Sequence, residues 1–311
     1  MQVWIFFVFL HQLENNELKM PKLYGDVKVP KKPDWLKIRL HRTAEYAEVQ
    51  QIVDKHCLHT ICSSGMCPNK AECWSRKTAT FMILGEVCTR NCRFCATMSG
   101  KPLAPDTEEP EKVAESVSLM GLRHVVLTSV TRDDLPDGGA AHWAATVEAI
   151  RRRNPEATIE LLIPDLDAKP HLIDVVLASK ADIVGHNIET TQRLTPLVRS
   201  RARYETSLAT LRYISSQGAV AKSGMMVGLG ESDDEVLQTL RDLHDAGVRI
   251  VTIGQYLRPT LEHYPVAEYI TPEKFEWYRQ QALAMGFNYC ASAPLVRSSY
   301  LADEALSSLT K

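Results

Sequence analysis

Residues 80–95 read Thr-Phe-Met-Ile-Leu-Gly-Glu-Val-Cys-Thr-Arg-Asn-Cys-Arg-Phe-Cys, an apolar run followed at once by three cysteines. Cys88, Cys92 and Cys95 have the spacing C-x3-C-x2-C, and the run offers no fourth cysteine. A closed structural zinc site needs four protein ligands, whereas a reactive site keeps one position open. The stretch therefore predicts a strand that ends in a metal centre with an open position.

Apolar runs of the same kind recur and alternate with segments of helical periodicity. They cover residues 80–86, 124–130, 158–163, 182–188, 222–229 and 249–255. Between them apolar residues recur at helical spacing, as in Val113, Val117 and Met120. Strands that alternate with helices predict right-handed βαβ units and a parallel sheet. Six such units predict an α/β fold, a partial (β/α)6 TIM-like barrel.

Polar residues follow each predicted strand, on the face of a barrel where chemistry normally takes place. After the second to sixth strands they are Thr128, Ser129, Arg132, Asp133 and Asp134; Asp165; Asn187 and Glu189; Gly228 to Glu231; Gln255 and Tyr256. Asp, Asn and Ser also start helices, so a purely structural role stays open for each of them. The face as a whole is the predicted active site.

A second set of three cysteines precedes the first strand. Cys62, Cys67 and Cys73 have the spacing C-x4-C-x5-C, again without a fourth cysteine at a matching distance. Residues 57–77 contain glycine, proline and asparagine and little periodicity, so we expect an irregular loop held by its metal. Cys62–Cys73 is called the first triad and Cys88–Cys95 the second triad.

The composition limits the classes of function. The chain has 311 residues, 45% hydrophobic and 24% charged, with a formal net charge of −2. Without a basic field we expect no nucleic-acid or membrane partner. Disulfide frameworks typify small domains, and the close cysteine spacings favour metal binding. We expect a monomer in a reducing, cytoplasmic compartment.

We divide the chain into four segments. Residues 1–19 are predicted to be a disordered or mis-assigned extension, since the apolar run at 3–10 is too short to span a bilayer and Met20 is a plausible natural start. Residues 20–77 form an arm and the first-triad loop, and residues 78–286 form the barrel. Residues 287–311 are a C-terminal extension that contains Arg297-Ser298-Ser299-Tyr300.

The second triad after the first strand of such a barrel resembles the radical S-adenosylmethionine superfamily. Further motifs resemble the lipoyl synthase family, in order along most of residues 20–303. They lie at residues 58–74, 81–90, 128–139, 186–190, 222–231, 254–259 and 297–300. The resemblance implies that the second triad holds a 4Fe-4S cluster whose free iron chelates S-adenosylmethionine, and that the first triad holds an auxiliary 4Fe-4S cluster. It also implies that a serine of residues 297–300 completes the auxiliary cluster; by position we assign Ser298, with Ser299 as the alternative.

The resemblance further implies a reaction, its partners and its contacts. Two sulfur atoms from the auxiliary cluster enter an octanoyl-lysine group at C6 and C8, and two S-adenosylmethionine molecules are used. The carriers are lipoyl-carrier domains of the 2-oxoacid dehydrogenase E2 subunit and the glycine cleavage H protein. Ferredoxin or flavodoxin supplies electrons, and an iron–sulfur carrier rebuilds the auxiliary cluster. The expected S-adenosylmethionine contacts are Phe94, Thr128, Ser129, Asn187, Glu189 and Arg199, and Met225 lines the same pocket or belongs to the core.

Two other hypotheses stay open. A zinc-stabilised or electron-transfer protein would use three cysteines and His56 or His59, which is a legitimate zinc set. A sulfur-inserting enzyme similar to biotin synthase would leave the first triad without a role. Of the two remaining cysteines, we expect Cys57 to be a packed or surface thiol and Cys290 to lie in the core.

Overall fold

The computed structural model describes residues 31–37, 43–76, 78–300 and 302–307. The predicted extension at residues 1–19 lies outside them. Eight strands form one sheet in the order β1 to β8, with β1 antiparallel to β2 and all later neighbours parallel. The strands are β1 (His59–Thr60), β2 (Thr80–Ile83), β3 (His124–Ser129), β4 (Thr158–Leu162), β5 (Ile183–Gly185), β6 (Ala221–Val227), β7 (Ile250–Gln255) and β8 (Tyr289–Ala293).

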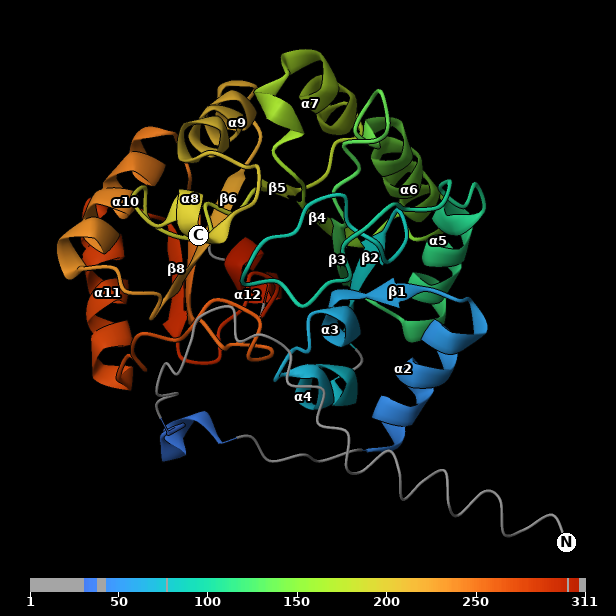
Figure 1. Ribbon diagram of the computed structural model, residues 1–311. Helices are drawn as coiled ribbons and strands as arrows, with labels where there is room; N and C mark the ends of the chain where they lie inside the picture. Colours follow the sequence, from blue (N-terminus) through green and yellow to red (C-terminus); the bar gives the residue numbers. More distant parts are fainter. Residues whose placement is uncertain (1–30, 38–42, 77, 301, 308–311) are drawn as a thin grey trace, which may run out of the picture.

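Helices surround the outside of this curved sheet, as Figure 1 shows. The helices after strands β2 to β7 are α5 (Glu109–Met120), α6 (Ala140–Arg153), α7 (Pro170–Leu177), α9 (Tyr204–Ser216), α10 (Asp233–Asp245) and α11 (Pro272–Met285). Their starts are encoded locally: Ser232 and Glu235 form a capping box on α10, and Thr271 caps α11 just before Pro272. The six predicted βα units are therefore confirmed.

The remaining helices are short, apart from α2. They are η1 (Asp34–Leu36), α2 (Ala44–Lys55), α3 (Ile61–Ser64), α4 (Lys70–Ser75), η2 (Leu166–Ala168), α8 (Thr195–Val198) and α12 (Ala302–Ser307). Ala305 of α12 packs on Ile183 and Ile250, the first residues of β5 and β7. Helix α12 therefore lies across the end of the barrel opposite the loops that follow the strands.

Two features differ from the expectation. The expected irregular loop at 57–77 contains the two helices α3 and α4, which are too short to produce a readable apolar periodicity. The side chain of Thr60 caps α3 by accepting from Ser63 N. In addition, the segment predicted as a C-terminal extension contributes β8, a seventh parallel strand, which pairs with β7.

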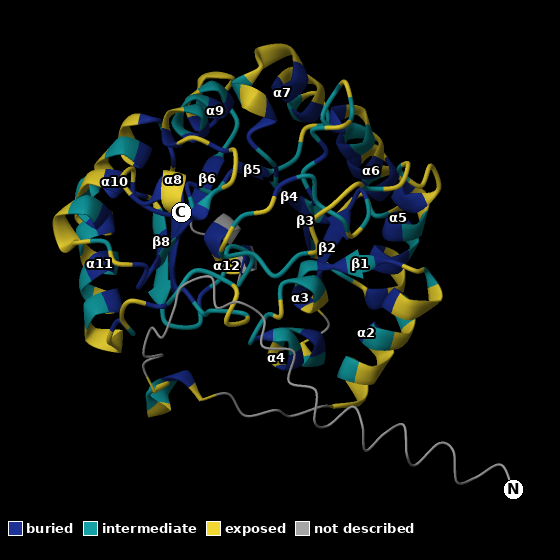
Figure 2. Cartoon of the chain, in the orientation of Figure 1, coloured by how far each residue is buried: buried dark blue, intermediate teal, exposed yellow. Residues whose placement is uncertain are grey.

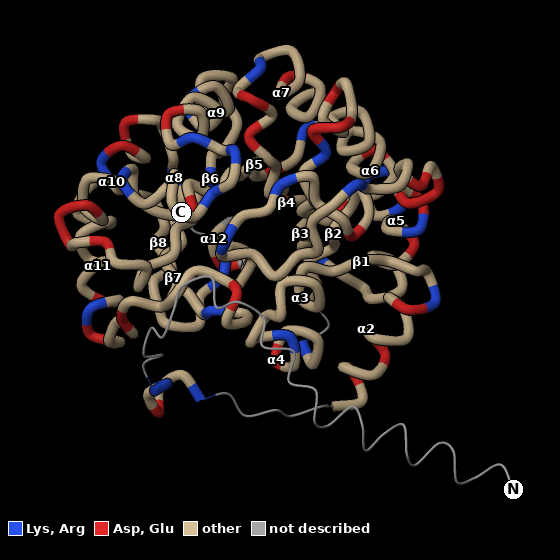
Figure 3. Tube along the Cα trace, viewed as in Figure 1, with Lys and Arg blue, Asp and Glu red and all other residues tan. Residues whose placement is uncertain are grey.

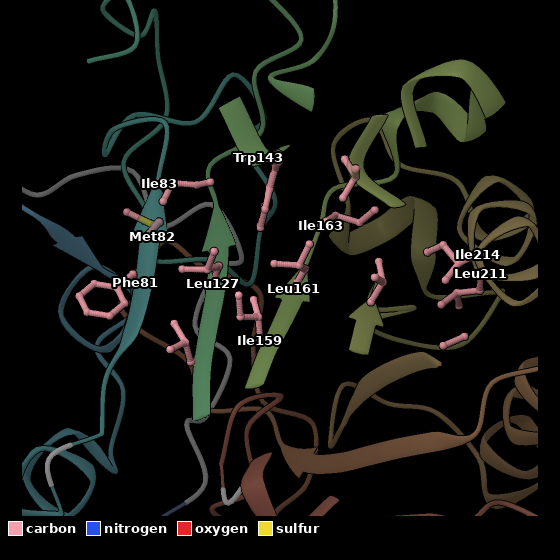
Figure 4. Packing of buried hydrophobic residues seen from close by; sticks show 14 of the residues in the cluster. Phe81, Met82, Ile83, Leu127, Trp143, Ile159, Leu161, Ile163, Leu211 and Ile214 are labelled. Atoms are coloured by element: carbon pink, nitrogen blue, oxygen red, sulfur yellow. The ribbon is translucent and has the colours of Figure 1, made fainter. Parts of the chain in front are cut away.

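The core lies between the sheet and its helices. Figure 4 shows the side chains of Leu127, Ile159 and Leu161 beside Trp143 of α6, and all four are fully buried. Each such side chain stabilises the fold by about 1.5–3 kcal/mol through removal of apolar surface from water. Figure 2 shows the same arrangement for the whole chain, with buried strands inside and exposed residues on the outer faces of the helices.

Charged residues of both signs are distributed over the helices and loops in the view of Figure 3. This mixed distribution agrees with the formal net charge of −2. Among the described residues, no helix is long and apolar enough to cross a membrane.

Candidate active site and cluster centres

Both triads face one cavity of about 1060 Å³ inside the barrel. Every residue that we predicted as a cluster ligand or an S-adenosylmethionine contact lines it, together with Met225 and Ser299. These residues are Cys62, Cys67, Cys73, Cys88, Cys92, Cys95, Phe94, Thr128, Ser129, Asn187, Glu189, Arg199, Met225, Ser298 and Ser299. Residues more than two hundred positions apart thus meet in one chamber.

The second-triad loop is fixed by Arg90, which lies between Cys88 and Cys92. Its guanidinium donates to both oxygens of Asp133 and of Asp165, over distances of 2.7–2.9 Å. Burial raises the pKa of Asp165, but the hydrogen bonds and charge of Arg90, together with His186 and the N–H of Asp167, lower it further and hold that pKa at about 2. The carboxylates come from the loops after β3 and β4, so three loops of the face are joined at the triad.

The surroundings of Cys88 suit a cluster ligand. Its Sγ accepts hydrogen bonds from the backbone N–H groups of Arg90 and Thr131, at 3.4 and 3.3 Å. Such donors stabilise a thiolate bound to iron and tune its cluster. Nε2 of His263 lies 3.0 Å from the carbonyl oxygen of Cys95, so the loop after β7 supports the same segment. The donor set and its hydrogen bonds therefore fit an iron–sulfur cluster.

The first triad is held by the two short helices. Cys62 lies on α3, Cys73 lies on α4, and Cys67 lies between them. Burial, and then the charges of Cys62 and Cys67, raise the pKa of the Cys73 thiol to about 12. Thiols that disfavour each other's ionisation need a bound cationic centre to become thiolates together.

The zinc hypothesis can be compared with this geometry. Among the described residues, no three His, Cys, Asp or Glu side chains are placed to hold a single metal ion. His59 instead lies 3.8 Å from Glu86. A cubane fits better, because its cysteine ligands bind different irons and do not have to meet at one point.

The segment from Leu295 to Tyr300 returns to the first triad. Asn69 donates to the carbonyl oxygen of Leu295 at 2.7 Å, and the hydroxyl of Tyr300 donates to Glu72 at 3.1 Å. Both partners flank Cys67 and Cys73, so the described end of the chain is anchored beside that triad. A ligand from this segment can therefore reach the first triad.

Two predicted S-adenosylmethionine contacts have unsatisfied polar atoms. Ser129 Oγ and Arg199 Nε are buried, line the cavity and have no hydrogen-bond partner among the described residues. Buried polar atoms normally have a partner, so these two fit a polar ligand in the cavity. The hydroxyl of Thr128 donates to the carbonyl oxygen of Leu162 at 3.1 Å and is already engaged.

Asn187 and Glu189 lie on the loop after β5. Burial raises the pKa of the Glu189 carboxyl. The charge of Arg199 and a hydrogen bond from Asn187 partly offset this increase. The backbone of Glu189 has a φ of 68° and bonds to Gly224 and Met226 of β6. The loop is therefore bound to the neighbouring strand, and its polar side chains are held in place.

A chain of hydrogen bonds in the protein interior fixes the position of Arg199. Arg199 donates to Ser207 Oγ at 2.8 Å, and His186 Nε2 lies 2.9 Å from the same oxygen. Nδ1 of His186 lies 2.9 Å from the carbonyl oxygen of Ile163, so this ring nitrogen carries the proton and Nε2 accepts from Ser207. Sequence reasoning missed this support, since His186 appeared only as part of a matching motif.

Several polar residues of the predicted face have structural roles instead. Arg132 donates to the carbonyl oxygens of Leu84 and Leu103 and to Asp134. Glu231 accepts from the N–H groups of Gly228 and Leu229, and the amide of Gln255 joins four backbone groups around β7. These residues shape the loops around the cavity.

The two remaining cysteines lie where we expected them. Cys57 is exposed, and Cys290 is buried within β8. Burial raises the pKa of the Cys290 thiol to about 12, so it stays protonated and inert.

The chain is similar to known proteins over most of its length. The model of the Radical SAM superfamily matches residues 82–243. The lipoyl synthase of Parabacteroides distasonis is 57% identical over 274 residues, which cover 88% of this chain and 98% of that protein. The lipoyl synthase of Phocaeicola vulgatus is 58% identical and that of Christiangramia forsetii 52%, each over 88% of this chain and over 96% and 94% of the relative.

Solved structures support the fold. Methylornithine synthase (PylB) is similar with a TM-score of 0.54 and 15% identity, over 68% of this chain and 70% of that one. Streptococcus suis SuiB bound to S-adenosylmethionine gives a TM-score of 0.55 and 10% identity, over 72% and 54%. Together with the two triads in one barrel cavity, the matches along most of the sequence establish that the chain belongs to the lipoyl synthase family of the radical SAM superfamily.

Proposed function

We propose that the chain inserts two sulfur atoms, at C6 and C8, into an octanoyl group carried on a lysine of a protein, and so forms the lipoyl group. The observation that carries this proposal is the shared cavity, which both triads and the serines of residues 297–300 line. The lipoyl synthases that are 52–58% identical to the chain support the same reaction.

Each triad would hold one 4Fe-4S cluster. Cys88, Cys92 and Cys95 would hold the second-triad cluster together with S-adenosylmethionine. Cys62, Cys67 and Cys73 would hold the first-triad cluster together with a serine. When bound, the second-triad cluster would supply the electron that cleaves S-adenosylmethionine, and the first-triad cluster would supply sulfur.

The atoms of the reaction balance with two S-adenosylmethionine molecules. Each one takes an electron from an external donor, such as ferredoxin or flavodoxin, and leaves as methionine and 5′-deoxyadenosine. The two deoxyadenosines would carry the hydrogen atoms from C6 and C8, and two C–S bonds would replace the two broken C–H bonds. The electron released with each C–S bond would pass to the iron of the first-triad cluster. An iron–sulfur carrier would then restore the first-triad cluster.

The chain's own residues position the reactants and exclude water. Arg90 and its aspartates hold the second-triad loop, while Ser129, Asn187, Glu189 and Arg199 offer polar groups to S-adenosylmethionine. Apolar side chains line the rest of the cavity, among them Met82, Val126, Leu162 and Met226. An apolar wall suits an octanoyl chain and protects a radical from side reactions.

The partners follow from this chemistry. An acyl-lysine arm enters from outside, so the substrates would be octanoylated lipoyl-carrier domains, including those of the 2-oxoacid dehydrogenase E2 subunit and the glycine cleavage H protein. All eight cysteines are free thiols, which supports a reducing, cytoplasmic compartment.

Anaerobic reconstitution of the full chain tests the proposal. We expect about eight irons per chain, from two cubanes. With S-adenosylmethionine, a reductant and an octanoyl-lysine peptide, the chain should form 5′-deoxyadenosine and a peptide with two added sulfur atoms. C73A should still form 5′-deoxyadenosine but add no sulfur, whereas C95A should do neither. Zinc in place of iron, or an unchanged peptide with both clusters loaded, would exclude the proposed reaction.

A further inference from the structure

Arg297 is a cation in the cavity wall that has no carboxylate partner. Its side chain is half-buried and lines the cavity beside the first triad. Within the described residues it forms no ion pair, and its one hydrogen bond runs from NH1 to the carbonyl oxygen of Val296, at 2.7 Å. Its other N–H groups are left for a further acceptor.

Arg90, which lines the same cavity, is paired with two carboxylates, those of Asp133 and Asp165. Removing a guanidinium from water without an anion is unfavourable, and structures normally compensate such a charge. The absence of a carboxylate near Arg297 therefore calls for another source of negative charge.

Arg297 lines the same cavity as the three cysteines of the first triad. The segment that contains it is anchored beside that triad, because Asn69 donates to the carbonyl oxygen of Leu295 and Tyr300 donates to Glu72. A cluster at this triad would bring the thiolates and sulfides that a desolvated guanidinium needs.

The backbone of strand β7 packs closely against the segment that contains Arg297. Gly254 of β7 lies directly against this segment: a Cβ on Gly254 would stand 2.1 Å from the carbonyl oxygen of Val296 and 3.3 Å from NH1 of Arg297. Only a residue without a side chain allows this approach. The position of the guanidinium thus depends on strand β7 as well as on the C-terminal segment.

We propose that Arg297 is a binding residue for the anionic iron–sulfur group of the first triad, supplying its counter-charge and donating hydrogen bonds to its sulfur atoms. This inference rests on the proposed function only insofar as the first triad holds a cluster. Arg is suited to this task because it stays charged when partly desolvated and has several N–H donors.

The inference predicts opposite effects of one substitution in two states of the protein. In the metal-free chain Arg297 is an uncompensated charge, so R297Q should leave the unfolding temperature equal or higher. In the loaded chain Arg297 stabilises the cluster, so R297Q should release iron from the first triad. A residue with a merely structural role would destabilise both states when replaced.

The experiment compares R297Q, R297K and the control R153Q in the full chain. Arg153 is also an arginine, but its side chain is 47% exposed at the end of α6, and its ion pair with Glu115 is long, at 3.9 Å. Each protein is reconstituted anaerobically and challenged with an iron chelator, and the loss of iron is followed over time. For R297Q we expect about half of the iron, the share of one of two cubanes, to leave about 10- to 100-fold faster.

R297K should retain iron better than R297Q, because the charge persists, and R153Q should behave as the unmodified chain. Iron loss from R297Q at the unmodified rate would overturn the inference, as would a lower unfolding temperature of its metal-free form. None of these measurements requires sulfur insertion. If two clusters bind but no sulfur is inserted, the proposed function fails while the role of Arg297 stands.

Discussion

Asn187 Nδ2 donates a hydrogen bond of 2.7 Å to Ser298 Oγ and so joins the loop after β5 to the C-terminal segment. Ser299 Oγ instead accepts from Thr80 Oγ1 at 2.8 Å. Thr80 starts β2, just after Thr78, whose side chain binds the carbonyl oxygen of Cys73. Ser298 is thus bonded to the loop that carries predicted S-adenosylmethionine contacts, and Ser299 to the strand that follows Cys73 and Thr78. We therefore propose Ser299, our alternative, ahead of Ser298 as the fourth ligand.

The two serines can be distinguished by separate alanine substitutions. S299A should lose the oxygen ligand of the first-triad cluster, so sulfur insertion should fall at least about tenfold, as for loss of a group next to a metal centre. Formation of 5′-deoxyadenosine should persist, because the second triad is intact. S298A should keep sulfur insertion closer to normal. The reverse pattern would restore Ser298 as the ligand.

Gly224 provides the space in which Asn187 and Ser298 meet. A Cβ at this position would lie 2.5 Å from Thr252 Oγ1, 2.9 Å from Asn187 Oδ1 and 3.2 Å from Ser298 Oγ. We expect G224A to displace Asn187 and to weaken S-adenosylmethionine binding by about tenfold, the equivalent of one lost hydrogen bond. Equilibrium dialysis on the loaded protein measures this. G100A is the control, since its Cβ would meet only Val87 at 3.5 Å; equal binding by G224A would contradict the expected displacement.

The sequence could predict which residues gather, but not which atoms face one another. Apolar runs located the strands and helical periodicity the helices, and the barrel rule then predicted that Ser129, Asn187 and Glu189 share one face. The neighbours Ser298 and Ser299 could not be separated, because their directions depend on long-range bonds such as Asn69 to Leu295. Non-local hydrogen bonds of this kind leave no periodic trace in a sequence.

The prediction of an irregular loop at residues 57–77 was wrong, because this segment contains two short helices. Helices α3 and α4 are formed by four and six residues, too few for an apolar stripe to repeat. Their stability comes from tertiary packing, as Trp74 of α4 is fully buried against the core. Sequence patterns report periodic burial over several turns, so short helices around a metal site are read as loops.

Glu160 and Lys222 form a buried ion pair inside the barrel, between β4 and β6. Lys222 Nζ lies 2.6 Å from Glu160 Oε1, and the side chains are only 4% and 2% exposed. Replacing one partner leaves the other charge buried, so K222M should destabilise the chain by about 3–5 kcal/mol. The double variant E160M/K222M should recover most of that loss. Denaturant midpoints of the four proteins measure the coupling, and additive losses would show that the charges do not stabilise each other.

His186 should make the stability of the chain depend on pH. Burial, followed by the charge of Arg199, lowers the pKa of His186 to about 4, although Asp165 opposes the shift. In the unfolded chain the pKa of histidine is about 6.5. Between these values the unfolded chain takes up a proton that the folded chain does not, so acidification favours unfolding.

The contribution of His186 to the free energy of unfolding is therefore complete above pH 6.5 and is lost as the pH falls to about 4. A shift of this size corresponds to about 3 kcal/mol across that window. H186Q should be less stable at neutral pH, because it loses the bonds to Ile163 and Ser207, but its denaturant midpoint should change less between pH 6.5 and 4. H171Q is the control, since His171 is exposed on α7. Equal pH slopes for H186Q and the unmodified chain would mean that other groups cause the acid sensitivity.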